Sequence, residues 1–218
     1  MEITYLGHSC FRIKAKSGTV VTDPYNKSVG LTLPTLSADI VTVSHPHDDH
    51  NNTAAVAGTA RRKQPFVVDQ AGEYEVEGVS IFGYQTKHDE LEGEERGENT
   101  VFTIIADDLR IVHLGDLGHM LSDKLIEELN GVDVLMIPVG GVYTIDAKMA
   151  ATLAAKIEPS YILPMHYKTD KHDEKTFGTV AGLQEFVTHY GHGSRVVSTL
   201  TLNKMTMPED LTEVIVFE

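Results

Sequence analysis

Histidine and aspartate side chains gather in one short stretch, residues 41–50, which reads VTVSHPHDDH. An apolar strand pattern comes first, and four side chains that can bind a metal follow it: His45, His47, Asp49 and His50. Alternate residues of an extended segment point the same way, so the first two can bind one ion and the last two can turn toward a second. Imidazole and carboxylate groups suit zinc, and also iron or manganese. The stretch therefore predicts a metal site. The alternative is a histidine-rich surface loop in which an aspartate caps a following helix.

Short runs rich in Val, Ile, Thr and Tyr, bounded by Gly, Asp or Pro, predict the strands that must position this site. They lie at residues 3–6, 11–15, 19–22, 40–43, 66–68, 79–84, 101–105, 110–114, 134–138 and 161–163. Helical patterns predict helices over residues 52–62, 122–130, 146–157 and 176–190. Strand pairs followed by a helix occur in both halves of the chain, which favours an α/β fold of two sheets covered by helices.

The chain has 218 residues, enough to bury a sizeable core. It shows no Pro/Ser-rich linker, so we expect a single domain over residues 1–218. That domain would have two pseudo-symmetric halves, about 1–95 and 96–218, joined by the acidic loop from Glu90 to Glu98.

The charge balance limits the classes of partner. With 18 Lys and Arg against 32 Asp and Glu, the formal net charge is −14, which disfavours nonspecific binding of nucleic acid or an anionic membrane. The single Cys10 cannot form an internal disulfide, the first residues show no signal-peptide pattern, and no apolar run reaches the ~20 residues that span a bilayer. These features favour a cytoplasmic location.

The order of motifs along the chain resembles that of the metallo-β-lactamase-fold hydrolases, whose signature is H-x-H-x-D-H after a strand. Four further motifs match in the expected order: Asp23 in VVTDPY, His88 in YQTKHDE, Asp116 in IVHLGDLGH and His166 in ILPMHY. The segments GHSCF, TDPY, HLGDLGH, DVLMIPVGG, YTIDA and PMHY are similar to those of a compact prokaryotic subgroup of metal-dependent hydrolases, related to the ascorbate-phosphate lactonase.

This resemblance implies a four-layer αβ/βα sandwich of the metallo-β-lactamase type and a centre for two divalent ions, with Zn²⁺ preferred over Mn²⁺ or Fe²⁺. It places His45, His47 and His88 on the first ion. It places Asp49, His50 and His166 on the second, with Asp116 as a bridge. Asp49 and Asp116 are then the catalytic carboxylates. We expect Asp23 behind the ligands, orienting the histidine loop through hydrogen bonds.

A few other polar residues each lie at a strand end or beside a ligand motif, so they are candidates for contacting the metal ligands or the substrate. They are His8, His119, Tyr143 and Tyr167. His8 and His113 are equally explained as packing residues. His172, His189 and His192 lie in polar or helix-end contexts and are expected at the surface.

The leading hypothesis is a hydrolase in which water activated by two metals attacks an ester-type bond, such as that of a lactone or cyclic ester. A phosphodiesterase acting on a small molecule or lipid is the alternative within the same fold. A metal-binding scaffold or regulatory protein with little turnover is the alternative from another class. We expect a small-molecule substrate, which could be anionic because the metals would attract it, and no nucleic-acid partner. A homo-oligomer could complete the pocket.

Overall fold

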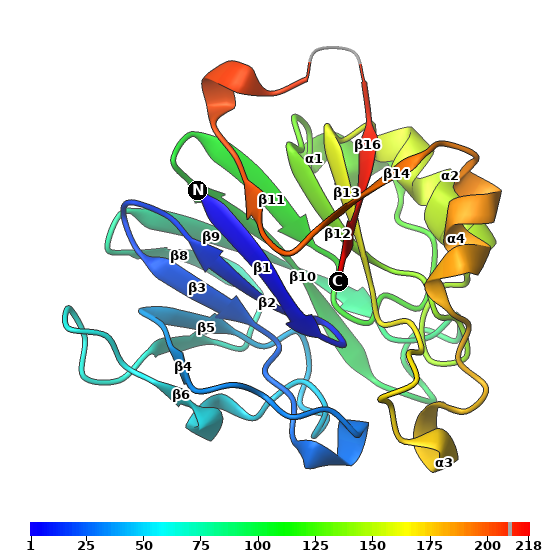
Figure 1. Cartoon of the computed structure of the whole chain (residues 1–218), viewed down its shortest axis with the longest axis horizontal. Coiled ribbons are helices and arrows are strands. Elements are labelled where there is room, and N and C mark those ends of the chain that lie inside the picture. The colour runs from blue at the N-terminus through cyan, green and yellow to red at the C-terminus, as the bar shows by residue number, and fades with distance from the viewer. Residues whose placement is uncertain (209–210) are drawn as a thin grey trace.

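The computed structural model describes residues 1–208 and 211–218 and contains two large β-sheets with a shared apolar core (Figure 1). All ten runs predicted as strands fall on strands. The four-layer α/β sandwich is confirmed, although the outer layer over the smaller sheet holds mainly short turns and a two-stranded ribbon.

The smaller sheet has six strands in the order β15-β1-β2-β3-β5-β7. Their bounds are Glu2–Gly7 (β1), Cys10–Lys14 (β2), Thr19–Thr22 (β3), Ile40–Thr42 (β5), Phe66–Val68 (β7) and Leu200–Thr201 (β15). Strands β1, β2 and β3 form an antiparallel meander, whereas β5 and β7 continue parallel to β3. Consequently β1, β3 and β5 all run in the same direction.

The larger sheet has eight strands in the order β14-β16-β13-β12-β11-β10-β9-β8. Their bounds are Gly72–Val76 (β8), Val79–Lys87 (β9), Glu98–Ala106 (β10), Leu109–His113 (β11), Val134–Pro138 (β12), Tyr161–Met165 (β13), Ser194–Val197 (β14) and Glu213–Phe217 (β16). Strand β10 is antiparallel to both β9 and β11, and β11, β12 and β13 are mutually parallel. Strands β9, β11 and β13 therefore also share one direction.

Two apolar cores lie on the two faces of the larger sheet. Between the sheets, Phe11 and Ile40 of the smaller one pack into the same cluster as Ile104 and Leu163 of the larger one. The opposite face packs against the helices Asp123–Glu128 (α1), Ala147–Ile157 (α2) and Leu183–Tyr190 (α4), which lie beside one another in Figure 1. The short helix Glu174–Phe177 (α3) lies apart from them.

The outer face of the smaller sheet is covered mainly by the short strands Leu36–Ser37 (β4) and Val56–Ala57 (β6) and by the 3-10 turns Lys27–Val29 and Thr53–Ala55. Phe177, at the end of the short helix α3, packs into the same apolar cluster. A third 3-10 turn, Lys204–Thr206, lies between β15 and β16.

Two of the four predicted helices are confirmed and two are not. Ser122 and Asp146 cap α1 and α2 as the sequence suggests, each accepting a hydrogen bond from a backbone N–H of the first turn. The predicted helix over 52–62 is wrong. At Gly58 the chain folds back so tightly that a Cβ atom there would lie 2.1 Å from the Arg62 carbonyl oxygen.

The predicted helix over 176–190 is interrupted. Residues 178–182 leave the helical path between α3 and α4 and pair with two other loops instead. The Ala181 N–H donates to the Gly140 carbonyl, and the Lys168 N–H donates to the Ala181 carbonyl. Val180 is buried in the outer core. Tertiary contacts therefore override the helical pattern there.

The acidic loop from Glu90 to Glu98 joins β9 to β10, which pair along their whole length. It therefore closes a hairpin within the larger sheet. The chain passes from the smaller to the larger sheet earlier, between β7 and β8, and β15 returns to the smaller sheet. The single-domain organisation stays a prediction. Within the described residues, no helix combines the length and apolar character that crossing a membrane requires.

Candidate metal centre

The predicted ligands all follow the carboxyl ends of strands that share a direction. In the larger sheet, His88 follows β9 directly, Asp116 lies three residues beyond β11, and His166 follows β13 directly. In the smaller sheet the histidine loop follows β5. Parallel strands bring their carboxyl ends to one edge, and the two sheets present these edges to each other. This topology explains how residues so distant in sequence meet.

Asp116 lies at the middle of the cluster. Its Oδ2 atom is 3.1 Å from Nε2 of His166, 3.2 Å from Nε2 of His50, 3.5 Å from Nε2 of His88 and 3.9 Å from Nε2 of His45. Two ligand atoms that bind one tetrahedral zinc ion lie about 3.3–3.6 Å apart, given usual bond lengths. The distances around Asp116, 3.1–3.9 Å, bracket this range, so these groups lie close enough together to share metal ions.

Two successive hydrogen bonds, from His45 to Ser44 and from Ser44 to Asp23, orient His45. Asp23 accepts a hydrogen bond from the Ser44 hydroxyl at 2.6 Å and another from the Ser44 N–H at 2.8 Å. Because the Ser44 hydroxyl donates its proton to Asp23, it must accept from Nδ1 of His45, which lies 2.9 Å away. The proton of a neutral His45 is thus on Nδ1, and its Nε2 lone pair faces Asp116.

Asp23 orients His50 in the same way. Nδ1 of His50 lies 2.9 Å from Oδ2 of Asp23, and an ionised carboxylate can only accept, so His50 carries a proton on Nδ1. Its Nε2 atom then points into the cluster. Asp23 is completely buried, and it accepts hydrogen bonds from Ser44, the neighbour of His45, and from His50 itself. The role of Asp23 as a residue that orients metal ligands stays a prediction.

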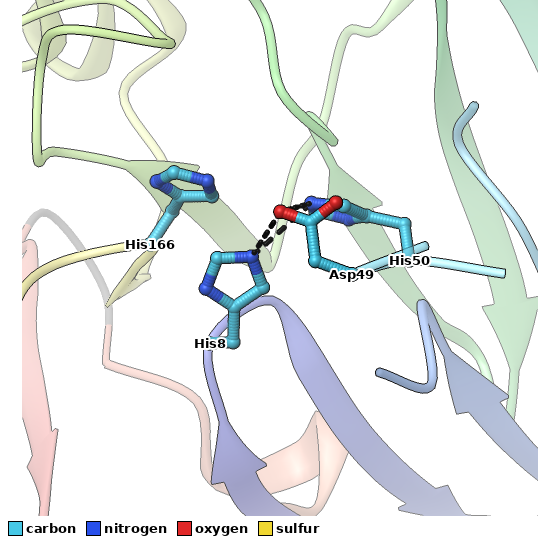
Figure 2. Close-up of side chains that lie close together, drawn as sticks. All are labelled: His8, Asp49, His50 and His166. Atoms are coloured by element: carbon cyan, nitrogen blue, oxygen red, sulfur yellow. Dashed lines mark hydrogen bonds and ion pairs between the residues drawn. The ribbon is translucent and has the colours of Figure 1, made fainter. Parts of the chain in front are cut away.

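His8 joins the cluster from the turn between β1 and β2, as Figure 2 shows. Its Nε2 atom is 3.3 Å from Oδ2 of Asp49 and 3.2 Å from Nε2 of His50. His8, Asp49, His50 and His166 together form one group whose ligand atoms all lie within 4.8 Å of one another, close enough to hold a metal ion. His45, His47 and His88 form a second group, and His45, His50 and Asp116 a third.

Several buried polar atoms in the cluster have no hydrogen-bond partner in the described structure. They are Nε2 of His45, Nδ1 of His88, Oδ1 of Asp116 and both ring nitrogens of His166. A buried polar atom without a partner costs about 1–3 kcal/mol, so a group of them in one place needs an explanation. Imidazole and carboxylate donors are also the ligands that zinc takes in proteins. The residues present therefore fit divalent metal ions.

The protonation equilibria support the same interpretation. Burial lowers the pKa of His45, and it lowers the pKa of His8 to about 3, with His166 adding to the shift of His8. Burial alone would raise the pKa of Asp116, but His166 and His50 hold it well below its ordinary value. His50 differs: burial alone would lower its pKa, but the charge of Asp116 and hydrogen bonds to Asp116 and Asp23 raise it well above its ordinary value. His45 and His8 are therefore neutral and Asp116 is ionised, which are the forms that bind metals, whereas a metal ion would have to displace the Nε2 proton of His50.

The backbone is strained at three residues of this region. His8, Asp23 and His166 have φ values of 55°, 38° and 52°, in the left-handed region that non-glycine residues rarely adopt. Each such residue costs about 1–3 kcal/mol, and strain of this kind concentrates at functional sites. The His166 N–H donates to the His8 carbonyl at 2.9 Å, which ties two of these residues together.

A cavity of about 290 Å³ opens beside the cluster. Its wall includes four predicted ligands, His47, Asp49, His88 and Asp116. The rest of its wall is Arg96, Tyr143, Thr176 and Phe177. His45, His50 and His166 are buried behind this wall. A substrate would therefore approach the cluster from the side of His47 and His88.

The other sequence candidates are placed differently. Tyr143 lines the cavity and donates from its hydroxyl to the Thr176 carbonyl. Tyr167 does not line it, because its ring is buried in the core under the helices. His119 does not line it either, since its Nε2 accepts the Lys87 N–H that precedes His88. His113 is a structural residue, with its ring between the Ser9 carbonyl and the Gly115 N–H.

Sequence reasoning missed three residues near the centre. Asn99 accepts the Asp116 N–H through Oδ1, and nothing in its sequence context signals this. Arg96 could have been noticed as the one cation in the acidic stretch ELEGEERGE. His172 is not at the surface as expected. It is buried, 6.0 Å from His8 between ring centroids, because the loop after Tyr167 folds over the centre.

Gly115 is required by close packing between the Asp116 loop and its neighbours. Its φ is +57°, and a Cβ atom would lie 2.3 Å from Oδ1 of Asn99 and 2.6 Å from the Ser44 Cβ. We expect Gly115→Ala to destabilise the protein by about 2–5 kcal/mol, because it combines backbone strain with overpacking. Urea unfolding measures the loss. Metal retention should fall as well, because Asn99 must move.

Gly131→Ala is the matched control for that variant. Gly131 also has a positive φ, +73°, but a Cβ atom there would have no atom of a non-neighbouring described residue within 4 Å. It should show only the backbone cost, about 1–2 kcal/mol. Equal losses in the two variants would contradict the packing explanation.

Comparison with known proteins supports the motif resemblance. The family model described as the beta-lactamase superfamily domain matches residues 2–166, a range that ends on the last predicted ligand. A UPF0173 metal-dependent hydrolase of Methanoculleus marisnigri is 31% identical over 191 residues, covering 78% of this chain and 82% of the relative.

Solved structures share the fold. A crystal structure from Thermotoga maritima, assigned to the Zn-dependent hydrolases of the metallo-β-lactamase superfamily, aligns with a TM-score of 0.78 and 33% identity. That alignment covers 100% of this chain and 99% of the other. A metallo hydrolase of Ignicoccus hospitalis aligns with a TM-score of 0.69 and 21% identity, over 93% and 99% of the two chains, and shows the fold alone. With its sequence, its fold and its cluster of histidines and aspartates in agreement, the chain belongs to the metallo-β-lactamase superfamily, in the UPF0173 family of metal-dependent hydrolases.

Proposed function

We propose that this chain is a two-metal hydrolase, with zinc as the first choice of metal, that cleaves an ester-type bond in a small molecule. The observation that carries the proposal is the approach of four imidazole Nε2 atoms to one carboxylate oxygen of Asp116. In this proposal one ion is held by His45, His47 and His88. The other is held by Asp49, His50 and His166, with Asp116 between them.

The protein's own residues prepare the site. Bound divalent ions supply Lewis acidity, which lowers the pKa of water and polarises a carbonyl or phosphoryl oxygen. Asp23 and Ser44 fix the imidazole protons on the outer nitrogens of His45 and His50, which keeps the inner lone pairs free. Asp49 is the partly exposed carboxylate of the cluster, with His8 beside it. It can accept a proton on the cavity side and pass it outward.

The substrate class follows from the cavity and from the subgroup resemblance. A volume of about 290 Å³ lies at the small end for ligand sites, which favours a compact molecule over a polymer. A lactone or cyclic ester is our first choice. A small phosphodiester is the alternative within the same chemistry.

Metal content tests the site. Wild-type protein loaded with zinc or manganese should retain about two ions per chain after dialysis, as a two-metal site requires. His45→Ala and His166→Ala should each lower that number, whereas His189→Ala should not, because His189 is exposed on α4. Fewer than one ion per wild-type chain would count against a two-metal centre.

Turnover tests the reaction. The metal-loaded protein is assayed on a lactone, a phosphodiester and a thioester, before and after chelation and with metal added back. We expect chelator-sensitive hydrolysis of the lactone. Preferential cleavage of the phosphodiester would identify the alternative activity. No hydrolysis of any of the three, with metal fully bound, would favour a scaffold with little turnover.

A further inference from the structure

Arg96 stands at the boundary between two cavities beside the metal centre. It lines the 290 Å³ cavity together with His88 and Tyr143, and the same three residues line a neighbouring cavity of about 430 Å³. Among the residues that the structure describes around the smaller cavity, Arg96 is the one lysine or arginine. The carboxylates there, Asp49 and Asp116, are both predicted metal ligands. Arg96 is thus the one permanently charged cation in the described wall of this cavity that can contact a substrate.

The loop that carries Arg96 is built to hold it in place. The Asp89 carboxylate accepts backbone N–H groups from Leu91, Gly93, Glu95 and Arg96 at 2.8, 2.9, 3.2 and 2.8 Å. Four such bonds close the loop around one side chain directly after His88. The position of the Arg96 backbone is therefore coupled to the end of β9 and to a predicted ligand.

The guanidinium itself packs on Tyr143. Its central carbon lies 5.9 Å from the centroid of the Tyr143 ring, within the range of a cation–π contact. Tyr143 is held in turn by its hydrogen bond to the Thr176 carbonyl. An arginine that is stacked on a fixed aromatic ring loses less freedom when it binds an anion than an unsupported side chain loses.

The ion pair that Arg96 makes among the described residues does not account for this arrangement. The Glu95 carboxylate lies 3.6 Å from Arg96, but the Glu95 side chain is 58% exposed, and pairs of this kind contribute about 0–1 kcal/mol. The surrounding stretch, ELEGEERGE, holds five glutamates and this single cation. Solubility does not explain this position of Arg96, because an arginine that serves solubility need not be held against a cavity wall.

We propose that Arg96 determines specificity by binding a carboxylate or phosphate group of the substrate, at the end remote from the bond that is cleaved. This inference rests on the proposed hydrolase function and narrows its substrate to a small anionic ester. A guanidinium can bind either oxyanion through two parallel hydrogen bonds. The overall charge of −14 would repel an anion in bulk, so a fixed cation beside the metals gives the site its selectivity.

Equilibrium binding tests the proposal without requiring turnover. Glutarate, 4-phosphonobutyrate and butyrate each offer one carboxylate to the metals, and only the first two carry a second anionic group for Arg96. By calorimetry on the metal-loaded protein, we expect one of the two dianions to bind about 10–100-fold tighter than butyrate, as for a hydrogen-bonded charge. The tighter of the two identifies the group as carboxylate or phosphate.

Arg96→Gln should abolish this preference and leave butyrate binding unchanged, and Arg96→Lys should retain part of it. Arg62→Gln is the matched control, since Arg62 also stacks on an aromatic ring, Phe66, and pairs with Glu77. The proposal is overturned if wild type binds neither dianion better than butyrate, or if Arg96→Gln keeps the preference. If the protein is not a hydrolase, the turnover assay shows it independently, because the metal-loaded protein then gives no hydrolysis that a chelator can stop.

Discussion

Asp116→Ala is expected to abolish retention of at least one metal ion and to lower kcat/KM by about 10³-fold or more, because several kcal/mol of metal-derived stabilisation are lost. Oδ2 of Asp116 lies within 3.9 Å of four imidazole nitrogens, so its removal takes away the one negative charge common to both predicted metal positions. Metal analysis after dialysis and steady-state kinetics on the best ester of the panel measure the two effects.

The fold should survive that change. The Asp116 N–H would still donate to Asn99, and the glycine turn before it would be unaltered. Asp116→Asn keeps the size of the side chain and removes its charge, so it tests whether metal binding requires the charge of Asp116 or only its shape. Asp48→Ala is the control, since Asp48 is an exposed carboxylate in the histidine loop. Full metal content in Asp116→Ala would contradict the bridging role.

The H-x-H-x-D-H stretch can be recognised from its own spacing, whereas His88, Asp116 and His166 are assigned as ligands through the motif order shared with the metallo-β-lactamase-fold hydrolases, and these ligand roles stay predictions. His88 and His166 each directly follow a strand whose apolar side chains are buried in the core. Strands with this composition are predictable, and parallel neighbours bring their carboxyl ends together. The strands and the general fold therefore needed little long-range information.

The supports of the ligands could not be read in this way. The contact of Asn99 with Asp116 joins residues separated by 17 positions, and no spacing rule connects them. The family resemblance suggests hydrogen bonds from Asp23 to the histidine loop, but not that Ser44, 21 positions away, is the partner. The same limit explains the failed helix over 52–62, whose alanines suit a helix locally. There, Val56 pairs with Leu36 in a short ribbon instead. Long-range contacts decided each of these cases.

Asp23→Asn is expected to damage the centre without contacting a metal. An asparagine amide can accept one of the bonds that Asp23 accepts now, from the Ser44 N–H, but its NH₂ group must donate toward His50. His50 would then accept at Nδ1 and carry its proton on Nε2, which points into the cluster. Since a protonated nitrogen cannot bind a metal, we expect metal affinity to fall about 10–100-fold, the usual cost of losing such a support.

Asp23→Ala separates this tautomer effect from a loss of stability. It leaves three buried donors without an acceptor, namely the Ser44 N–H, the Ser44 hydroxyl and Nδ1 of His50, at a cost of about 3–5 kcal/mol. Asp23→Asn should unfold at a urea concentration closer to wild type yet bind metal poorly, with His50 protonated on Nε2 by ¹⁵N NMR. Asp39→Asn, at a buried aspartate that accepts the Thr19 N–H far from the centre, should bind metal normally. If Asp23→Asn kept both full metal affinity and the Nδ1-protonated form of His50, Asp23 would be a packing residue, and the histidine loop would be oriented by its own backbone.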